Sequence, residues 1–145
     1  MFSIVVDEKL ISSIELINVD DLKPHEHVVL DRKKALVSYL KSISPEILIS
    51  SLIVCSKTNT IIDGHHRFFA LKELGFNTIP VTLVDYNSDL IKPHIDDRIT
   101  KNEILQAANL KKYLEPKSSK HLIFEEKTGV WKPIILISSL FSLNL

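Results

Sequence analysis

A run of polar side chains near the middle of the chain combines groups that bind anions. An apolar strand-like segment ends at Asp63, and Gly64 then precedes His65, His66 and Arg67 at the expected start of a helix. The first turn of a helix exposes backbone N–H groups at its positive dipole end, and a glycine lets the backbone approach a ligand closely. Two imidazoles and a guanidinium beside such a helix start favour a phosphate or diphosphate site. The alternative is a structural turn in which Asp63 ends its strand and caps the helix.

The elements that must position this run alternate between strands and helices. The apolar patterns predict strands over residues 14–19, 48–56, 60–63, 78–86 and 122–124, with a β-rich segment over 131–138. Helical spacing predicts helices over residues 31–42 and 65–74, and a third that begins at Thr100 and is ended by Leu114-Glu115-Pro116-Lys117. This order indicates an α+β fold, with a mixed sheet flanked by helices. We expect a single compact domain over residues 1–145.

Individual residues predict how these elements begin and what they bury. Asp31 is a candidate N-cap, and Thr100 with Glu103 matches a capping box. Cys55 lies in an apolar run, which favours a buried small side chain over a reactive thiol. Trp131 is expected to pack on the core, and Pro80 is expected at a strand end or on an edge strand.

Composition excludes several classes of protein. The chain has 145 residues, with 18 Lys+Arg against 18 Asp+Glu, so its formal net charge is zero. That balance argues against the strongly basic surface of a nucleic-acid-binding protein. A single cysteine excludes an intramolecular disulfide, and the six histidines lack the helical spacing of zinc sites. The first residues lack the pattern of a secretory signal, and no apolar run is long enough to span a bilayer, so we expect a cytoplasmic protein.

The run from Asp63 to Arg67, placed after a hairpin and before an apolar helix, resembles the ParB/sulfiredoxin-like superfamily. In that fold, nucleotide phosphates lie on this same helix start. Sulfiredoxins carry their catalytic cysteine at the position that His65 occupies here, so the resemblance does not imply sulfiredoxin activity.

The sequence is most similar to the free serine kinases of this superfamily, which phosphorylate L-serine to O-phospho-L-serine. Three separated segments carry the similarity, which extends from about residue 14 to about residue 123. They are Leu22-Lys23-Pro24-His25-Glu26, then Asp63-Gly64-His65-His66-Arg67, and finally Ile99-Thr100-Lys101-Asn102-Glu103 together with Pro116-Lys117-Ser118-Ser119-Lys120-His121.

The resemblance implies a role for each motif. Glu26 would accept the proton of the attacking hydroxyl, as phosphoryl transfer requires, although a carboxylate in a loop can also be a solvated surface group. Asp63 would bind that hydroxyl or a phosphate-bound Mg²⁺, which would otherwise be held through the phosphates. The donor phosphates would contact Gly64, His65, His66, Arg67, Ser119, Lys120 and His121.

Two departures from the family pattern concern the donor. Ser119 and Lys120 stand where the kinases have Thr and Arg, which keeps the hydroxyl and the charge but loses bidentate geometry. Only about fifty residues separate Arg67 from Ser119, whereas the ADP-dependent kinases carry a long additional segment there. We therefore expect pyrophosphate to serve as donor in preference to ADP or ATP.

Two classes of function stay open at this point. The first is an enzyme, a phosphotransferase that acts on free L-serine with Mg²⁺ and needs neither nucleic acid nor a membrane. The second is a ParB-like regulator that binds a nucleotide or nucleic acid without kinase activity. The neutral composition and the intact segments around Glu26 and His121 favour the enzyme.

Overall fold

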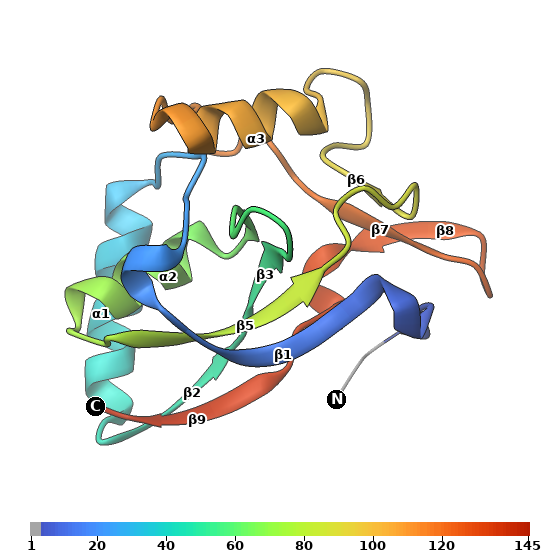
Figure 1. The fold of residues 1–145 in the computed structure, drawn as a ribbon. Coiled ribbons are helices and arrows are strands. Elements are labelled where there is room, and N and C mark those ends of the chain that lie inside the picture. Colours follow the sequence, from blue (N-terminus) through green and yellow to red (C-terminus); the bar gives the residue numbers. More distant parts are fainter. Residues whose placement is uncertain (1–3) are drawn as a thin grey trace.

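In the computed structural model, which describes residues 4–145, a mixed sheet of four strands lies at the centre of the fold (Figure 1). Its order is β1-β5-β3-β4, and the strands are β1 (Ile11–Asn18), β5 (Thr78–Val84), β3 (Leu52–Cys55) and β4 (Ile61–Asp63). The central pair, β3 and β5, is parallel, and the two outer pairs are antiparallel. The α+β fold with a mixed sheet is therefore confirmed.

Within residues 4–145, two smaller sheets and three helices surround this centre. The smaller sheets pair β2 (Glu46–Ser50) with β9 (Leu140–Asn144), and place β7 (Leu122–Glu125) between β6 (Ile91–Lys92) and β8 (Val130–Pro133). The helices are α1 (Leu30–Ile43), α2 (His65–Glu73) and α3 (Lys101–Leu110), and short 3-10 turns are η1 (Glu8–Leu10), η2 (Val19–Asp21) and η3 (Ile134–Ile137).

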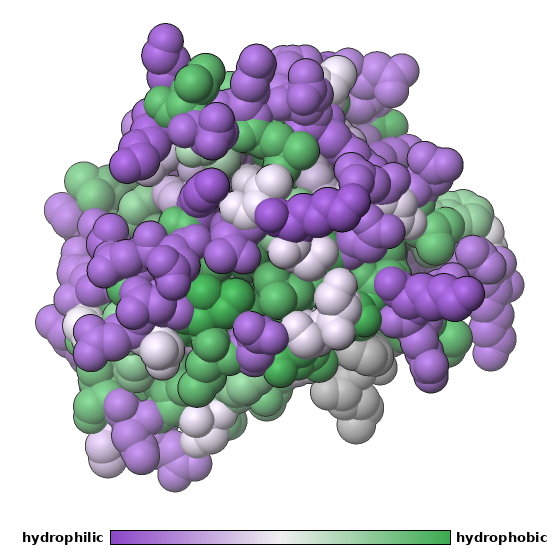
Figure 2. Space-filling model, in the orientation of Figure 1, coloured by the Kyte–Doolittle hydropathy of each residue, from purple (hydrophilic) through white to green (hydrophobic). Residues whose placement is uncertain are grey.

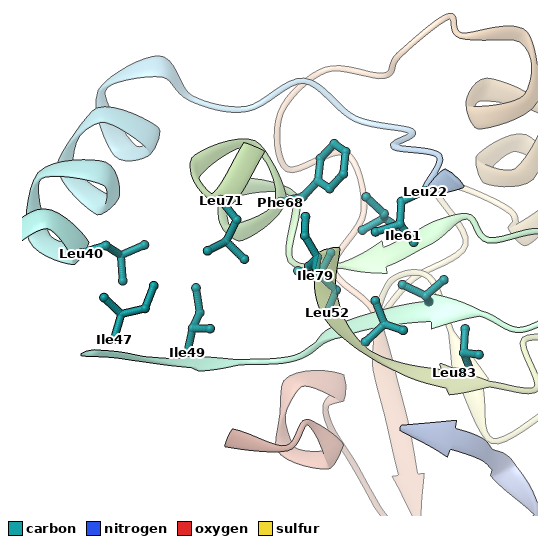
Figure 3. Close-up of a cluster of buried hydrophobic side chains, with 12 residues drawn as sticks. Leu22, Leu40, Ile47, Ile49, Leu52, Ile61, Phe68, Leu71, Ile79 and Leu83 are labelled. Atoms are coloured by element: carbon teal, nitrogen blue, oxygen red, sulfur yellow. The ribbon is translucent and has the colours of Figure 1, made fainter. Parts of the chain in front are cut away.

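The strand β3 is buried on both of its faces, which explains its uninterrupted apolar sequence. Leu52 and Val54 belong to a core cluster that includes residues of α1, α2 and β2. Ile53 and Cys55 belong to a second cluster on the opposite face, beneath η3, β6 and β7. In Figure 3, side chains of α1 and α2 point toward those of β2 within the first cluster. The buried position expected for Cys55 is confirmed.

The continuous strand predicted over residues 48–56 is wrong, because the chain changes sheets at Ser51. This residue is fully buried, and its hydroxyl lies 2.8 Å from that of Thr82. Its backbone N–H donates to Ser139 O, and its Oγ accepts from Ser139 N–H. The preceding residues consequently pair with β9, while the following residues enter the central sheet. A buried serine thus satisfies the backbone groups that the change of sheet would leave unpaired.

The helix starts agree only partly with expectation. Thr100 caps α3, since its Oγ1 accepts from Glu103 N–H at 3.1 Å. The Asp31 cap is wrong, because α1 has Val29 at its N-cap position and no side chain among residues 4–145 caps it. Pro80 lies in an inner strand, but at its start, where β5 is paired with β1 and not yet with β3.

The C-terminal residues form more structure than their sequence predicts. The segment after Val130 divides into β8, the turn η3 and β9, and β9 was not expected. The expected packing of Trp131 on the core is wrong, because Trp131 lies outside both core clusters. It is half-buried, with its ring 5.2 Å from that of Phe124 and 4.2 Å from Lys92 Nζ.

The surface is hydrophilic over α3, whereas hydrophobic residues gather near β1 and β5 (Figure 2). Ile14 and Leu16 of the edge strand β1 are among the exposed apolar side chains. Within residues 4–145, no helix has the length and apolar character needed to cross a membrane. The first residues were expected to lack a secretory signal, and residues 1–3 of that segment lie outside the described range.

Candidate active site

One cavity of about 340 Å³ brings together every site residue that the sequence predicts. It opens at the N-terminal end of α2 and is bounded on other sides by the Glu26 segment, the loop before β7 and the start of η3. Its lining comprises Glu26, Arg32, Ile62, Asp63, Gly64, His65, His66, Arg67, Lys117, Ser119, Lys120, His121, Pro133, Ile134 and Ile135.

The turn into α2 depends on a glycine. Gly64 has φ of +106°, and a Cβ there would lie 2.6 Å from Arg67 Nη2 and 2.7 Å from Leu52 Cδ2. Arg67 is folded beneath the turn, where its Nη2 donates to Ser51 O at 3.1 Å and to Asp63 Oδ2 at 3.4 Å. No side chain in residues 4–145 caps α2, so the capping alternative for Asp63 is wrong.

The two histidines after Gly64 hold the segment that carries Glu26. His65 Nε2 accepts the backbone N–H of His25, and His66 Nε2 accepts that of Val29, each at 3.1 Å. Because a backbone N–H is the donor, neither Nε2 atom carries a proton. Burial lowers the pKa of both imidazoles, which agrees with their being neutral. Both rings line the cavity, but these atoms are occupied in fixing the backbone.

Glu26 is fixed by its backbone and buried at its carboxylate. It forms an isolated bridge with Leu114, in which His27 N–H donates to Leu114 O and Leu114 N–H donates to His25 O. The side chain accepts at Oε1 from both the N–H and the Oγ of Ser119, at 3.2 Å each. Burial raises the pKa of the Glu26 carboxyl, and the hydrogen bonds from Ser119 oppose that shift. An upward shift of the pKa makes the ionised carboxylate a stronger base.

A cluster of neutral histidines lies behind this carboxylate. His25 is fully buried, with its ring 4.4 Å from that of His65 and 6.0 Å from that of His121. His121 Nε2 lies 2.7 Å from the hydroxyl of Tyr86. Burial lowers the pKa of His25 to about 4 and that of His121 well below its usual range. These rings therefore contribute hydrogen bonds rather than charge at neutral pH.

Positive charge is concentrated at the cavity, although the whole chain is neutral. Arg32, Arg67, Lys117 and Lys120 line it, against the two carboxylates of Glu26 and Asp63. An apolar wall from Pro133 to Ile135 completes the lining. The excess of cationic groups around a helix start favours an anion with several negative charges.

Sequence reasoning missed part of this site. Arg32 lies in the first turn of α1, and Lys117 lies within a motif already singled out. Their positive charge, close in sequence to the predicted site residues, was the feature that could have identified them as part of an anion site. Nothing in the sequence indicated that Tyr86 lies behind His121. His27 is placed away from the cavity, with its ring 5.4 Å from that of Tyr113.

The chain is similar to several known proteins. No protein-family model matches the sequence. The chain is 36% identical over 80 residues to an ATP-dependent L-serine kinase of Staphylothermus marinus, an alignment covering 53% of this chain and 31% of that protein. It is 32% identical over 81 residues to an ADP-dependent L-serine kinase of Thermococcus kodakarensis, covering 52% and 32%.

A ParB-like protein and a solved kinase structure agree with the fold. The chain is 31% identical over 86 residues to a ParB-like protein of Sulfolobus acidocaldarius, covering 59% of this chain and 42% of that one. A free serine kinase in complex with AMP superposes with a TM-score of 0.51 at 25% identity, covering 64% of this chain and 38% of that chain. The matched region spans about a third of the length of the kinases. The resemblance to the free serine kinases is thus confirmed over slightly more than half of this chain.

Proposed function

We propose that this protein transfers a phosphoryl group to the hydroxyl of L-serine and releases O-phospho-L-serine. One observation carries the proposal above the others. The buried Glu26 carboxylate shares a cavity with the Gly64 helix start and with a set of cationic side chains. A base beside an anion site is the arrangement that phosphoryl transfer requires, because that chemistry consists mainly of positioning and charge neutralisation.

Each group then has a defined task. The donor phosphates would rest on the N–H groups of the first turn of α2, neutralised by Lys117 and Lys120, while Arg67 would add positive charge from beneath the turn. The serine hydroxyl would approach from the side of Glu26, which takes its proton as the new O–P bond forms. The bond from phosphorus to the leaving phosphate oxygen breaks, and that oxygen keeps the electron pair. His65 and His66 would keep Glu26 in place through the backbone of its segment.

A magnesium ion fits the chemistry of the donor better than it fits a protein cage. Among residues 4–145, no group of three or more His, Cys, Asp or Glu side chains could hold a metal. Asp63, the candidate protein ligand, already accepts from Arg67. We therefore assign Mg²⁺ to the donor phosphates, as is usual for phosphoryl transfer, where it would offset their charge.

For the donor, we propose pyrophosphate. The short spacing between Arg67 and Ser119 supports this choice, and so does a cavity near the lower end of the usual range for ligand sites. A nucleotide is the second candidate, because the related kinases are named as ATP- or ADP-dependent. The apolar wall formed by Pro133, Ile134 and Ile135 offers a surface on which the nucleobase of such a donor could lie.

A panel of donors decides between these candidates. The protein is incubated with L-serine, Mg²⁺ and pyrophosphate, ADP or ATP at equal concentration, and phosphoserine is followed by mass spectrometry. We expect the fastest formation with pyrophosphate. A clear preference for a nucleotide contradicts the donor proposal and leaves the kinase proposal standing. Absence of phosphoserine with every donor, together with a nucleotide-induced rise in melting temperature, would support the ParB-like regulator instead.

A further inference from the structure

The orientation of His25 fixes which of its nitrogens carries a proton. Its Nδ1 lies 2.6 Å from the carbonyl oxygen of Ile61, which can only accept. Neutral His25 must therefore hold its proton on Nδ1, and its Nε2 is left as an acceptor. That Nε2 lies 3.1 Å from Ser119 Oγ.

The Ser119 hydroxyl consequently faces two acceptors with one proton. Its Oγ lies 3.2 Å from Glu26 Oε1 and 3.1 Å from His25 Nε2. When Glu26 is ionised, the charged carboxylate is the stronger acceptor and takes the hydrogen bond. When Glu26 is protonated that advantage disappears, and the imidazole becomes the better acceptor. The direction of this hydroxyl is therefore linked to the protonation of Glu26.

We propose that the Ser119 hydroxyl donates to Glu26 before phosphoryl transfer and to His25 Nε2 after it, which makes His25 a positioning residue that acts on Glu26 through Ser119. The proposal rests on the proposed function. In phosphoryl transfer, the O–H bond of the substrate L-serine breaks and its proton passes to the Glu26 carboxylate. The new O–P bond forms as the donor P–O bond breaks. The switch stabilises Glu26 in the form that has gained this proton.

The surroundings keep the proton on Glu26 rather than on His25. The titratable and charged groups around the chain of hydrogen bonds are Asp63 from β4, His65, His66 and Arg67 from α2, and Lys117 and His121 from the loop before β7. Burial holds the pKa of His25 at about 4, so that a charged imidazole is disfavoured. Burial and the charge of Asp63 both raise the pKa of Glu26.

Two substitutions should move the Glu26 pKa in opposite directions. His25→Asn keeps a donor for Ile61 but removes the acceptor for Ser119, so the protonated form of Glu26 loses support and its pKa should fall by about one unit. Ser119→Ala removes the donor to the carboxylate, so the pKa should rise. In the Ser119→Ala background, His25→Asn should leave the pKa unchanged, since the link between the two residues is already broken.

Carbon-13 NMR titration of the Glu26 carboxyl measures these shifts without any assay of activity. Nitrogen-15 NMR of the unsubstituted protein should show His25 with its proton on Nδ1, which tests the geometry without a variant. Turnover of His25→Asn should fall by roughly tenfold, with the KM for the donor nearly unchanged. A protonated Nε2, or an equal effect of His25→Asn with and without Ser119, overturns the proposal. Because the NMR results do not depend on phosphoserine formation, the failure of the kinase proposal would be seen separately.

Discussion

Replacing Gly64 with alanine tests the turn on which the site is built. The residue has φ of +106°, a conformation that costs an L-residue about 1–2 kcal/mol. The new Cβ would also lie 2.6 Å from Arg67 Nη2 and 2.7 Å from Leu52 Cδ2, and overpacking of this kind costs about 1–3 kcal/mol. Together these effects predict that Gly64→Ala lowers the free energy of unfolding by roughly 2–5 kcal/mol.

The chain offers a matched control at the other end of the same helix. Gly75 has φ of +91°, but a Cβ added there would meet nothing within 4 Å. Gly75→Ala should therefore show only the backbone cost, about 1–2 kcal/mol. Urea denaturation followed by circular dichroism gives both values, provided that the m-value is unchanged. An equal loss in the two variants would refute the crowded packing of Arg67 and Leu52 around Gly64.

Three further predictions concern charge and catalysis. Glu26→Gln should lower turnover at least 100-fold while leaving phosphoserine binding largely intact, measured by steady-state kinetics and calorimetry; turnover within threefold would remove Glu26 from the mechanism. Lys117→Ala should raise the KM for the donor roughly tenfold with little effect on the KM for serine, and an effect confined to serine would mean that the two ends of the site are reversed. The protein should lose stability in acid: unfolded His25 binds a proton below its ordinary pKa of 6.5 but folded His25 only below about 4, so the unfolded state binds more protons between these values. When the pH falls from 7 to 5, protonation of unfolded His25 alone should lower the free energy of unfolding by about 2 kcal/mol. His65 and His121 should act in the same direction, because burial lowers the pKa of each. Equal urea midpoints at the two pH values would contradict this prediction.

The local patterns predicted most of the elements because they depend on neighbours in sequence. The helix after Gly64, the hairpin that precedes it and the Thr100 cap all follow from short-range periodicity and capping chemistry. The change of sheet at Ser51 did not, because it depends on hydrogen bonds to Thr82 and Ser139, which lie far away in the chain. A β-branched run looks the same whether it forms one strand or two.

The candidate site shows the same division. Residue types, motif spacing and the family resemblance selected many of the residues that line the cavity, but not Arg32 or Lys117. They could not show how those side chains are used, because hydrogen bonds between distant segments decide that. His65 and His66 were expected on phosphates, and their Nε2 atoms instead hold the backbone at His25 and Val29. Arg67 was expected to face the donor, and its Nη2 is engaged beneath the turn.

If this cavity transfers a phosphoryl group to free serine with Glu26 as the base, formation of O-phosphoserine must depend on the Glu26 carboxylate. Phosphorus-31 NMR measures this dependence, with one sample that contains the protein, L-serine, Mg²⁺ and a donor, and a parallel sample that contains Glu26→Gln instead. We expect an O-phosphoserine signal that grows in the first sample and that grows at least 100-fold more slowly in the second. Equal growth in both samples, or no phosphoserine signal with any donor, would contradict it.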